Sequence, residues 1–441
     1  MTIHAKPAPL RLAVTALALC LPLLAAPAAA QSVRDEIEAL RRQVDEANRA
    51  LEAALQRIDE LETKQEETQE QVAEIPKPRV RPGRKNVDLE VYGHINQAFA
   101  YFDNGQTSRF DVVDNDNSGS RLGFRGRYKS GDWSAGVRLE ASFEVNTTDE
   151  LTFDSDSDLG TLASSDDGES DFLSVRHADT FFSHKDYGTI SLGFGPIATE
   201  GVSETDLSGT TLISESDVDD IGGEFQFGND DNAQLGSGFE VDDFFSNLDG
   251  SRDSRIRYAT PRFAGVQGVV AMRVDDDENG VGQFFPDASL NYEGEVSGFE
   301  VEAQGGYRRE DGSNTFIASA STLAPFGTSL TLGGGVETFD GTNPPDAENF
   351  VFVKLGQQLD LFEFGKTKFS VDFFRGQDNS QADPFTGEQT EAISVGGGVV
   401  QEVKPLGAEV FAAGRFYDVD IGDGTDTDSL FVLFTGARVR F

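Results

Sequence analysis

Arginines spaced two residues apart are the side chains of this chain best suited to select a charged solute. Arg121, Arg125 and Arg127 follow one another in a single alternating stretch. Further arginines hold the same phase of later alternating stretches: Arg138, Arg176, Arg255, Arg257 and Arg415. Side chains two residues apart share one face of a strand, and a row of guanidinium groups along a narrow, poorly screened passage favours anions. The alternative is that they pair with carboxylates such as Glu140 and Glu144 and only brace a wall.

The segment 196–251 has the opposite charge, with fourteen Asp and Glu residues and no Lys or Arg. Two adjacent glycines, Gly222 and Gly223, permit a sharp bend that would carry neighbouring carboxylates towards the arginines. These carboxylates are Asp217, Asp219, Asp220 and Glu224. Together the two sets would produce a transverse field across a pore. The alternative is that the acidic charge keeps an external surface hydrated.

Catalytic and metal chemistry is not predicted. After residue 30 the chain has three histidines, His94, His177 and His184, no Cys, and no Gly-x-Ser-x-Gly motif. Nucleophilic catalysis needs a nucleophile with a base in reach. The segment 114–119 opens like a calcium loop, but Arg125 stands where a bidentate Glu is required. We expect no enzyme, no cofactor and no resident metal; weak divalent binding by external acidic loops stays open.

The first thirty residues predict a secretory signal peptide. Lys6 and Arg11 precede an apolar run over 12–26, and residues 28–30 are three alanines that suit cleavage. The sequence has a formal net charge of −41, which argues against nucleic acid as a partner. We therefore expect an exported, acidic protein.

Residues 31–75 predict an α-helical coiled coil. Apolar residues recur at the a positions Ile37, Val44, Leu51, Ile58 and Val72, with Gln65 among them. They also recur at the d positions Val33, Leu40, Ala47, Ala54, Leu61 and Ile75, with Thr68 among them. Such a seam is buried only against another helix, so it predicts oligomerisation. The segment 76–86 is rich in Pro and basic residues. It is predicted either to be a stiff spacer or to lie against anionic phospholipid headgroups.

From residue 87 to residue 441 the chain alternates apolar and polar residues in short stretches separated by turns. The expected strands lie near 87–102, 118–129, 132–146, 172–183, 187–195, 252–260, 264–275, 285–294, 298–310, 314–323, 327–339, 349–361, 366–376, 391–402, 407–419 and 428–441. Sixteen is an even number, as bacterial outer-membrane barrels have. The pattern predicts an all-β transmembrane barrel of sixteen antiparallel strands.

Connection lengths support the same interpretation. Short turns, as at 129–132 and 295–298, should alternate with long loops rich in Asp, Gly and Ser, as expected for short periplasmic turns and long external loops. The chain ends in an alternating strand whose last residue is Phe441. In the fourth strand His177 and Asp179 share the phase of Val175, which indicates a bulge, an error of phase or a subunit contact.

Four stretches of residues 87–441 resemble the trimeric porins of Gram-negative outer membranes. They are Val91-Tyr92-Gly93, Ser120-Arg121-Leu122-Gly123-Phe124-Arg125-Gly126, Tyr187-Gly188-Thr189-Ile190-Ser191-Leu192-Gly193 and the terminal Phe441. The resemblance implies a water-filled pore narrowed by an inward third loop, with Arg121 in the constriction. It also implies that Phe441 is read by the outer-membrane assembly machinery.

The resemblance predicts passive diffusion of small hydrophilic solutes and ions through a homotrimer in the outer membrane. The added coiled coil is similar to that of some substrate-selective porins, including the DcaP type. Two alternatives follow: a channel selective for small carboxylates, or a structural link to peptidoglycan with little conductance. Lipid and lipopolysaccharide are expected at the outer wall.

Overall fold

The computed structural model describes residues 87–144, 146–153, 173–228, 239–276, 282–310, 312–341, 346–378, 389–422 and 427–441. The chain separates into two units, Met1–Pro76 and Lys77–Phe441. The predicted signal peptide, coiled coil and basic linker, residues 1–86, lie outside the described residues. Within the described part of the chain, no helix is long and apolar enough to cross a membrane.

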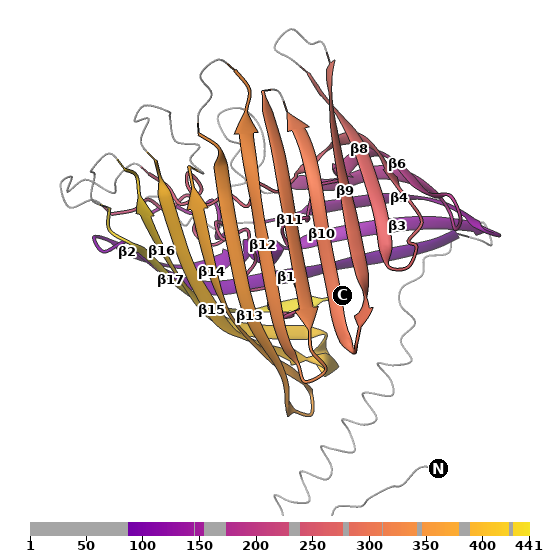
Figure 1. Ribbon diagram of the computed structural model, residues 1–441. Coiled ribbons are helices and arrows are strands. Elements are labelled where there is room, and N and C mark those ends of the chain that lie inside the picture. Colours follow the sequence, from indigo (N-terminus) through magenta and orange to yellow (C-terminus); the bar gives the residue numbers. More distant parts are fainter. Residues whose placement is uncertain are drawn as a thin grey trace, which may run out of the picture. The chain divides into compact units, whose positions relative to one another are not determined.

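The described residues form one antiparallel sheet that closes on itself (Figure 1). Its strands are β1 (Val87–Asp103), β2 (Ser108–Asp114), β3 (Arg121–Ser130), β4 (Trp133–Ser142), β5 (Ser174–His184), β6 (Gly188–Pro196), β7 (Arg252–Ala259), β8 (Val266–Asp276), β9 (Gly282–Val296), β10 (Phe299–Glu310), β11 (Ser313–Leu323), β12 (Thr328–Phe339), β13 (Glu348–Phe362), β14 (Gly365–Gln377), β15 (Glu391–Val403), β16 (Ala408–Asp420) and β17 (Leu430–Arg440). β1 pairs with β17, from His94 opposite Arg440 to Asp103 opposite Phe431. This pairing removes both free edges.

The second position of the barrel differs from the prediction. β2 pairs with residues 97–103 of β1, and β3 pairs with residues 87–94 of the same strand. The two strands therefore share one place in the wall, which gives sixteen positions and confirms the predicted barrel. The segment 108–114, which we expected to be loop, is strand. Between the two halves the chain leaves the ladder and forms a short 3-10 helix, η1 (Asp116–Ser118).

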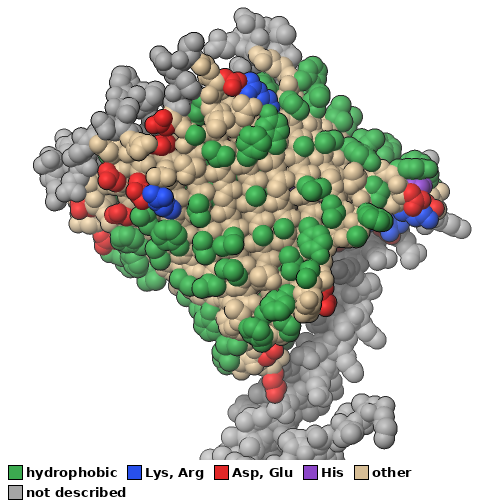
Figure 2. Space-filling view, viewed as in Figure 1, with side chains coloured by type: hydrophobic (Ala, Val, Ile, Leu, Met, Phe, Trp, Pro, Cys, Tyr) green, Lys and Arg blue, Asp and Glu red, His purple; other side chains and the backbone are tan. Residues whose placement is uncertain are grey.

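Alternation decides which side chains meet lipid. On β17, Phe431 and Leu433 are exposed outward, whereas Val432 and Phe434 are buried inward. Figure 2 shows one outer face of the wall, with apolar side chains spread over it and most charged ones near its edges. Because only every second residue of a barrel strand touches lipid, short alternating strands suffice to span the membrane.

The strict alternation of short and long connections was wrong at three places. The connection between β1 and β2 covers only 104–107, that between β8 and β9 only 277–281, and that between β10 and β11 only 311–312. The other turns follow the prediction, as at 131–132 and 297–298. External strand ends can therefore be closed by tight turns as well as by long loops.

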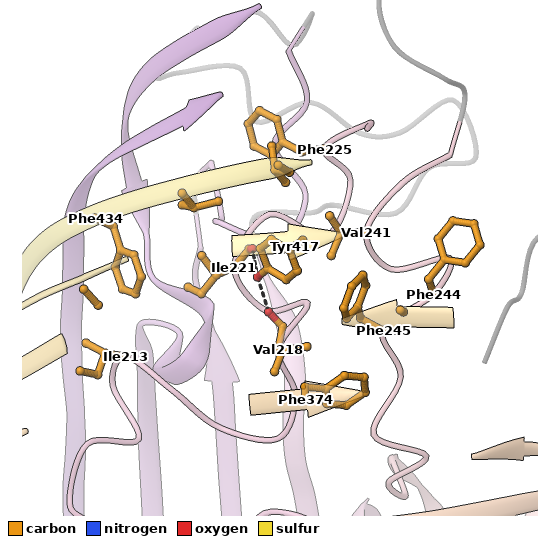
Figure 3. Packing of buried hydrophobic residues seen from close by; sticks show 14 of the residues in the cluster. Ile213, Val218, Ile221, Phe225, Val241, Phe244, Phe245, Phe374, Tyr417 and Phe434 are labelled. Atoms are coloured by element: carbon orange, nitrogen blue, oxygen red, sulfur yellow. Dashed lines mark hydrogen bonds between the residues drawn. The ribbon is translucent and has the colours of Figure 1, made fainter. Parts of the chain in front are cut away.

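The third loop, L3 (residues 197–251, between β6 and β7), packs an apolar core inside the barrel. This core joins L3 side chains to the inward faces of β1 and β13–β17, and we call this region the aromatic half. Figure 3 labels ten of its members: Ile213, Val218, Ile221, Phe225, Val241, Phe244, Phe245, Phe374, Tyr417 and Phe434. The ring of Phe245 lies 5.2 Å from that of Tyr417 and 5.7 Å from that of Phe374. Much of the lumen face of these strands is therefore a packing surface.

Candidate functional site

A polar cavity of about 490 Å³ lies inside the barrel between L3 and the wall formed by β3, β5 and β7. Its lining residues are Asp116, Asn117, Ser118, Arg121, Arg176, Glu204, Thr211, Glu215, Asp217, Asp220 and Arg252. All are polar or charged. Such a lining suits water and ions, in contrast to the aromatic half beside it.

One side of the cavity carries three guanidinium groups, which we call the arginine wall: Arg121 of β3, Arg176 of β5 and Arg252 of β7. The Nε of Arg121 donates a hydrogen bond to the carbonyl oxygen of Gly119 at 2.9 Å. Arg176 contacts Glu140 at 3.3 Å, and Arg252 pairs with Glu200. Carboxylates thus hold two of the three, Glu140 from the wall and Glu200 from L3, whereas a backbone carbonyl positions Arg121.

A β-bulge directs Arg176 into the cavity. In the ladder between β4 and β5, Glu140 lies opposite His177 and Ala141 lies opposite Val175, so Arg176 is the extra residue. Val175 is 54% exposed outward, whereas His177 is only 8% exposed. A bulge changes the phase of a strand and re-aims its side chains. It explains the mixed phase of this strand and confirms the first of the three interpretations.

The opposite side carries carboxyl groups: Glu204, Glu215, Asp217 and Asp220 of L3, joined by Asp116 of η1. Burial raises the pKa of Glu215 to about 8, although Lys354 opposes that rise. Burial also raises the pKa of Asp217 to about 6, with a contribution from the negative charge of Asp116. L3 therefore presents carboxyl groups that ionise less readily than free ones.

Hydrogen bonds to the barrel wall hold L3 in place. Asp287 of β9 accepts from the backbone N–H of Thr199 at 2.8 Å. Lys354 of β13 donates to the carbonyl oxygen of Ser214 at 2.6 Å. Tyr417 of β16 donates to the carbonyl oxygen of Val218 at 2.6 Å (Figure 3). Three separate strands, β9, β13 and β16, thus each hold a different part of the loop.

A tight bend precedes the last part of L3. Gly222 has a φ of +93°, a conformation that suits glycine, and its N–H donates to the carbonyl oxygen of Thr148 at 2.7 Å. The predicted bend is therefore present. It brings L3 against the connection between β4 and β5.

Six predicted arginines do not line the cavity: Arg125, Arg127, Arg138, Arg255, Arg257 and Arg415. Arg255 is buried and donates to Asp179 at 2.7 Å. Arg138 faces the same carboxylate at 3.7 Å, and Arg125 lies 3.6 Å from Glu90. For these three, the structure supports the alternative that they brace the wall.

The predicted acidic residues divide in the same way. Asp217 and Asp220 line the cavity, whereas Asp219 and Glu224 do not.

Phe441 is 62% exposed, and its N–H donates to the carbonyl oxygen of Gly93 at 3.0 Å. The last residue therefore extends the pairing of β17 with β1.

Four charged lining residues escaped sequence reasoning: Arg252, Glu204, Glu215 and Asp116. Ser254 is exposed on the outer face of the barrel. Because side chains two residues apart share one face of a strand, Arg252 is also expected to point outward. It lies at the strand end, opposite Pro196, where a long side chain can turn inward. Asp116 lies in the unexpected break between β2 and β3. The two glutamates had no signal beyond the acidity of their loop.

The closed barrel and its polar passage define a membrane channel. The sequence model of the Gram-negative porin family matches residues 13–422, and the chain belongs to this family. No curated protein matches the chain. It is an outer-membrane porin, a channel for passive diffusion of small hydrophilic solutes.

Solved structures show the same fold at low identity. The anion-selective porin of Comamonas acidovorans is 17% identical, with a TM-score of 0.51 over 80% of this chain and 100% of that one. A trimer form of OmpT of Vibrio cholerae is 12% identical, with 0.50 over 81% and 100%. OmpF of Salmonella typhi, in complex with daunomycin, is 13% identical, with 0.51 over 81% and 98%.

Proposed function

We propose that the polar cavity between the arginine wall and L3 is the constriction of this channel. The observation that carries the proposal is the lining itself, with three guanidinium groups facing five carboxyl groups and no apolar side chain. Ions and small hydrophilic solutes pass through it, selected by size and by the field between the two sides. Charges in such a partly desolvated passage are poorly screened, so they act strongly on a passing ion.

The constriction is fixed rather than gated in this proposal. L3 is held by side chains of β9, β13 and β16 and is packed on the aromatic half. Moving it would break these hydrogen bonds and expose buried aromatic rings. Passive diffusion requires no such movement.

Charge reversal at Arg121 tests the constriction in planar-bilayer recordings under a salt gradient. Arg121→Glu should shift the reversal potential towards cation preference. Arg125→Glu is the matched control, because the same change lies in the same strand but outside the cavity lining. Equal shifts from both variants, or a shift from neither, would place the constriction elsewhere.

We also propose that the channel has no catalytic activity. Among the described residues, the Nε2 of His94 lies 3.1 Å from the carbonyl oxygen of Ser118 and 3.0 Å from that of Gly119. A histidine engaged by backbone in this way is poorly placed as a general base. Purified protein should release no product from esters or peptides above a detergent blank.

The assembly that we propose is a homotrimer. Gln97 is exposed on the outward face of β1 between Ile95 and Phe99, and donates to Asp114 at 2.7 Å. A polar amide facing hydrocarbon is unfavourable, which supports cover by a second copy. Trimers should migrate as such on gels before boiling.

A single-cysteine comparison locates the contact, since the only native cysteine is Cys20 in the predicted signal peptide. Gln97→Cys should resist a lipid-soluble maleimide, whereas Phe316→Cys, at a position 52% exposed on the outer wall, should react. Equal labelling would place β1 against lipid. Contacts with lipopolysaccharide, with the assembly machinery through Phe441 and with peptidoglycan through the coiled coil stay predictions.

A further inference from the structure

Two inward arginines, Arg127 of β3 and Arg257 of β7, have no role in the constriction or in bracing the wall. Neither lines the polar cavity. Among the described residues, neither forms an ion pair, and the Nε of each is buried without a hydrogen-bond acceptor. Guanidinium groups stay charged at every physiological pH. The lumen therefore holds two cations with no carboxylate partner, and such groups can bind an anion.

These arginines lie in one row of inward side chains that crosses β3 to β7. The ladder register places Arg127 opposite Gly136, Gly136 opposite Phe181, Phe181 opposite Ser191 and Ser191 opposite Arg257. Neighbouring strands are about 4.8 Å apart, so Phe181 lies roughly 10 Å along the wall from each arginine. The row thus has an aromatic ring at its centre, a cation at each end and small residues between them.

The ring of Phe181 lies against the wall, over Gly136 of the neighbouring strand. It fills the space where a Cβ on Gly136 would come within 2.5 Å of the ring. The guanidinium carbon of Arg127 lies over this ring, 5.8 Å from its centre. A cation–π contact of this kind attracts the guanidinium without using its N–H groups. Those N–H groups therefore stay available to an acceptor on a solute.

A second stack in the same lumen shows what is unusual about Arg127. The guanidinium of Arg273 of β8 lies 5.1 Å from the ring centre of Phe285 of β9. Arg273, however, pairs with Glu310 at 2.7 Å and faces Asp253 at 3.8 Å. The protein has already neutralised that cation, whereas Arg127 combines an aromatic ring with an unpaired charge.

Carboxylates near the row already have partners. Asp179, the next inward residue of β5 before Phe181, accepts from Arg255 at 2.7 Å. Glu200 of L3 pairs with Arg252. Asp287 of β9 accepts from backbone N–H groups of L3. A solute anion that reaches the row therefore meets cations that these carboxylates do not occupy.

A flat anion would use both features of the row at once. Guanidinium binds a carboxylate through paired N–H donors, and its flat face stacks on aromatic groups. We propose that Arg127 and Phe181, with Arg257 as a second positive charge, form a subsite of the lumen for small aromatic carboxylates. Chloride or a saturated carboxylate has no aromatic face and gains only the attraction of the charge.

This subsite is separate from the proposed constriction. Arg127 lies six residues beyond Arg121 on β3, towards the short turn at 131–132, which is roughly 20 Å along an extended strand. It adds a preference among anions of equal charge, which the field of the constriction does not supply. Its loss should therefore leave the chloride current nearly unchanged.

The experiment measures block of the single-channel current of the full-length protein in planar bilayers. The bath is about 0.1 M potassium chloride, so that screening is moderate. Sodium benzoate and sodium cyclohexanecarboxylate are the two probes, since they match in charge and carbon skeleton but only benzoate is flat and aromatic. The blocking constant should be roughly fivefold lower for benzoate, because only benzoate can stack.

Three variants assign the block to the row. Arg127→Gln should raise the benzoate constant roughly tenfold, since a charged donor is lost. Phe181→Leu should bring benzoate to about the level of cyclohexanecarboxylate, because apolar volume stays and the aromatic face is lost. Phe285→Leu is the matched control: it removes the ring under a guanidinium that Glu310 already engages, and should change neither constant.

Equal block by the two anions in the wild-type protein would overturn the proposal without any variant. Benzoate block that survives Arg127→Gln would also overturn it, as would equal effects of Phe181→Leu and Phe285→Leu. Unheated gel migration shows whether each variant is folded. The Arg121→Glu test of the constriction uses potassium chloride alone, so a shift there without a preference for benzoate removes only this inference.

Discussion

The two halves of the barrel lumen use the same strand pattern for opposite purposes. On β3–β7 the inward side chains include several arginines that stay partly exposed, such as Arg125 at 34% and Arg138 at 27%. In the aromatic half the inward side chains are rings such as Phe350 and Phe374, buried against L3. The inward side chains of a barrel strand are therefore open to water only where no loop packs on them.

Charged groups differ between the halves in the same sense, with the buried pair of Arg255 and Asp179 as an exception. In the aromatic half Lys354 and Arg415 are 1% and 2% exposed, and each pairs with a buried aspartate. Buried ion pairs are costly to break, because one partner then stays charged and unpaired. Partly exposed arginines can exchange their partners for water or a passing ion. The buried pairs of the aromatic half therefore help to fix L3, and in our proposal the other half conducts.

The largest effect expected from breaking this contrast is on stability in the aromatic half. Phe245→Ala removes a fully buried ring that contacts Tyr417 and Phe374. Truncating such a ring should lower the free energy of unfolding by about 3–5 kcal/mol. Urea unfolding in lipid vesicles, followed by the fluorescence of the single tryptophan, Trp133, measures it.

Phe316→Ala is the control for this variant, because its ring lies on the outer wall and is 52% exposed. Its loss should be clearly smaller, since the surrounding lipid can fill the space. Equal losses would mean that L3 contributes no core to the barrel.

Much of the barrel could be predicted from the sequence, because alternation and turn residues are local signals. The resemblance implied that L3 folds inward, but not that it packs an apolar core against the wall. Its fourteen acidic residues were interpreted either as one side of a constriction or as a hydrated surface, while Phe225, Phe227, Phe244 and Phe245 within it were the overlooked signal of a core. Aromatic residues on the inward phase, such as Phe350, carried the matching signal on the wall.

The constriction was only partly predictable for the same reason. Asp217 and Asp220 were found because a glycine bend marked them, and Arg121 because a motif did. Arg252 and Glu215 depend on where a strand end and a packed loop meet in space. Alternation along a single strand carries no information about such long-range contacts.

A second prediction concerns β3–β7 and distinguishes an arginine that stabilises the wall from one that does not. Arg255→Gln leaves the buried Asp179 facing only Arg138 at 3.7 Å. The free energy of unfolding should fall by about 3 kcal/mol, because the carboxylate loses its nearest cation. Arg125→Gln, at a partly exposed ion pair of 3.6 Å, should lower it by less than about 1 kcal/mol. Similar losses would contradict a bracing role specific to Arg255.

A third prediction concerns the hydroxyl that joins β16 to L3. Tyr417→Phe keeps the ring but removes the hydroxyl, whose single proton is shared between the carbonyl oxygens of Val218 and Ile221 at 2.6 and 2.5 Å. The free energy of unfolding should fall by about 1–3 kcal/mol, since buried carbonyl groups are left unpaired. A loosened L3 should also make single-channel current noisier. A quiet current at unchanged stability would show that the ring alone positions the loop.

The smallest effect expected distinguishes two arginines of one strand, β7. Arg252 lines the cavity and Arg257 does not. Arg252→Gln should raise the cation-to-anion permeability ratio roughly twofold, because one of three guanidinium groups is lost from a passage with weak screening. Arg257→Gln should change it much less. Both variants should unfold at nearly the wild-type urea concentration, so a shared loss of stability would assign Arg252 to the wall instead of the passage.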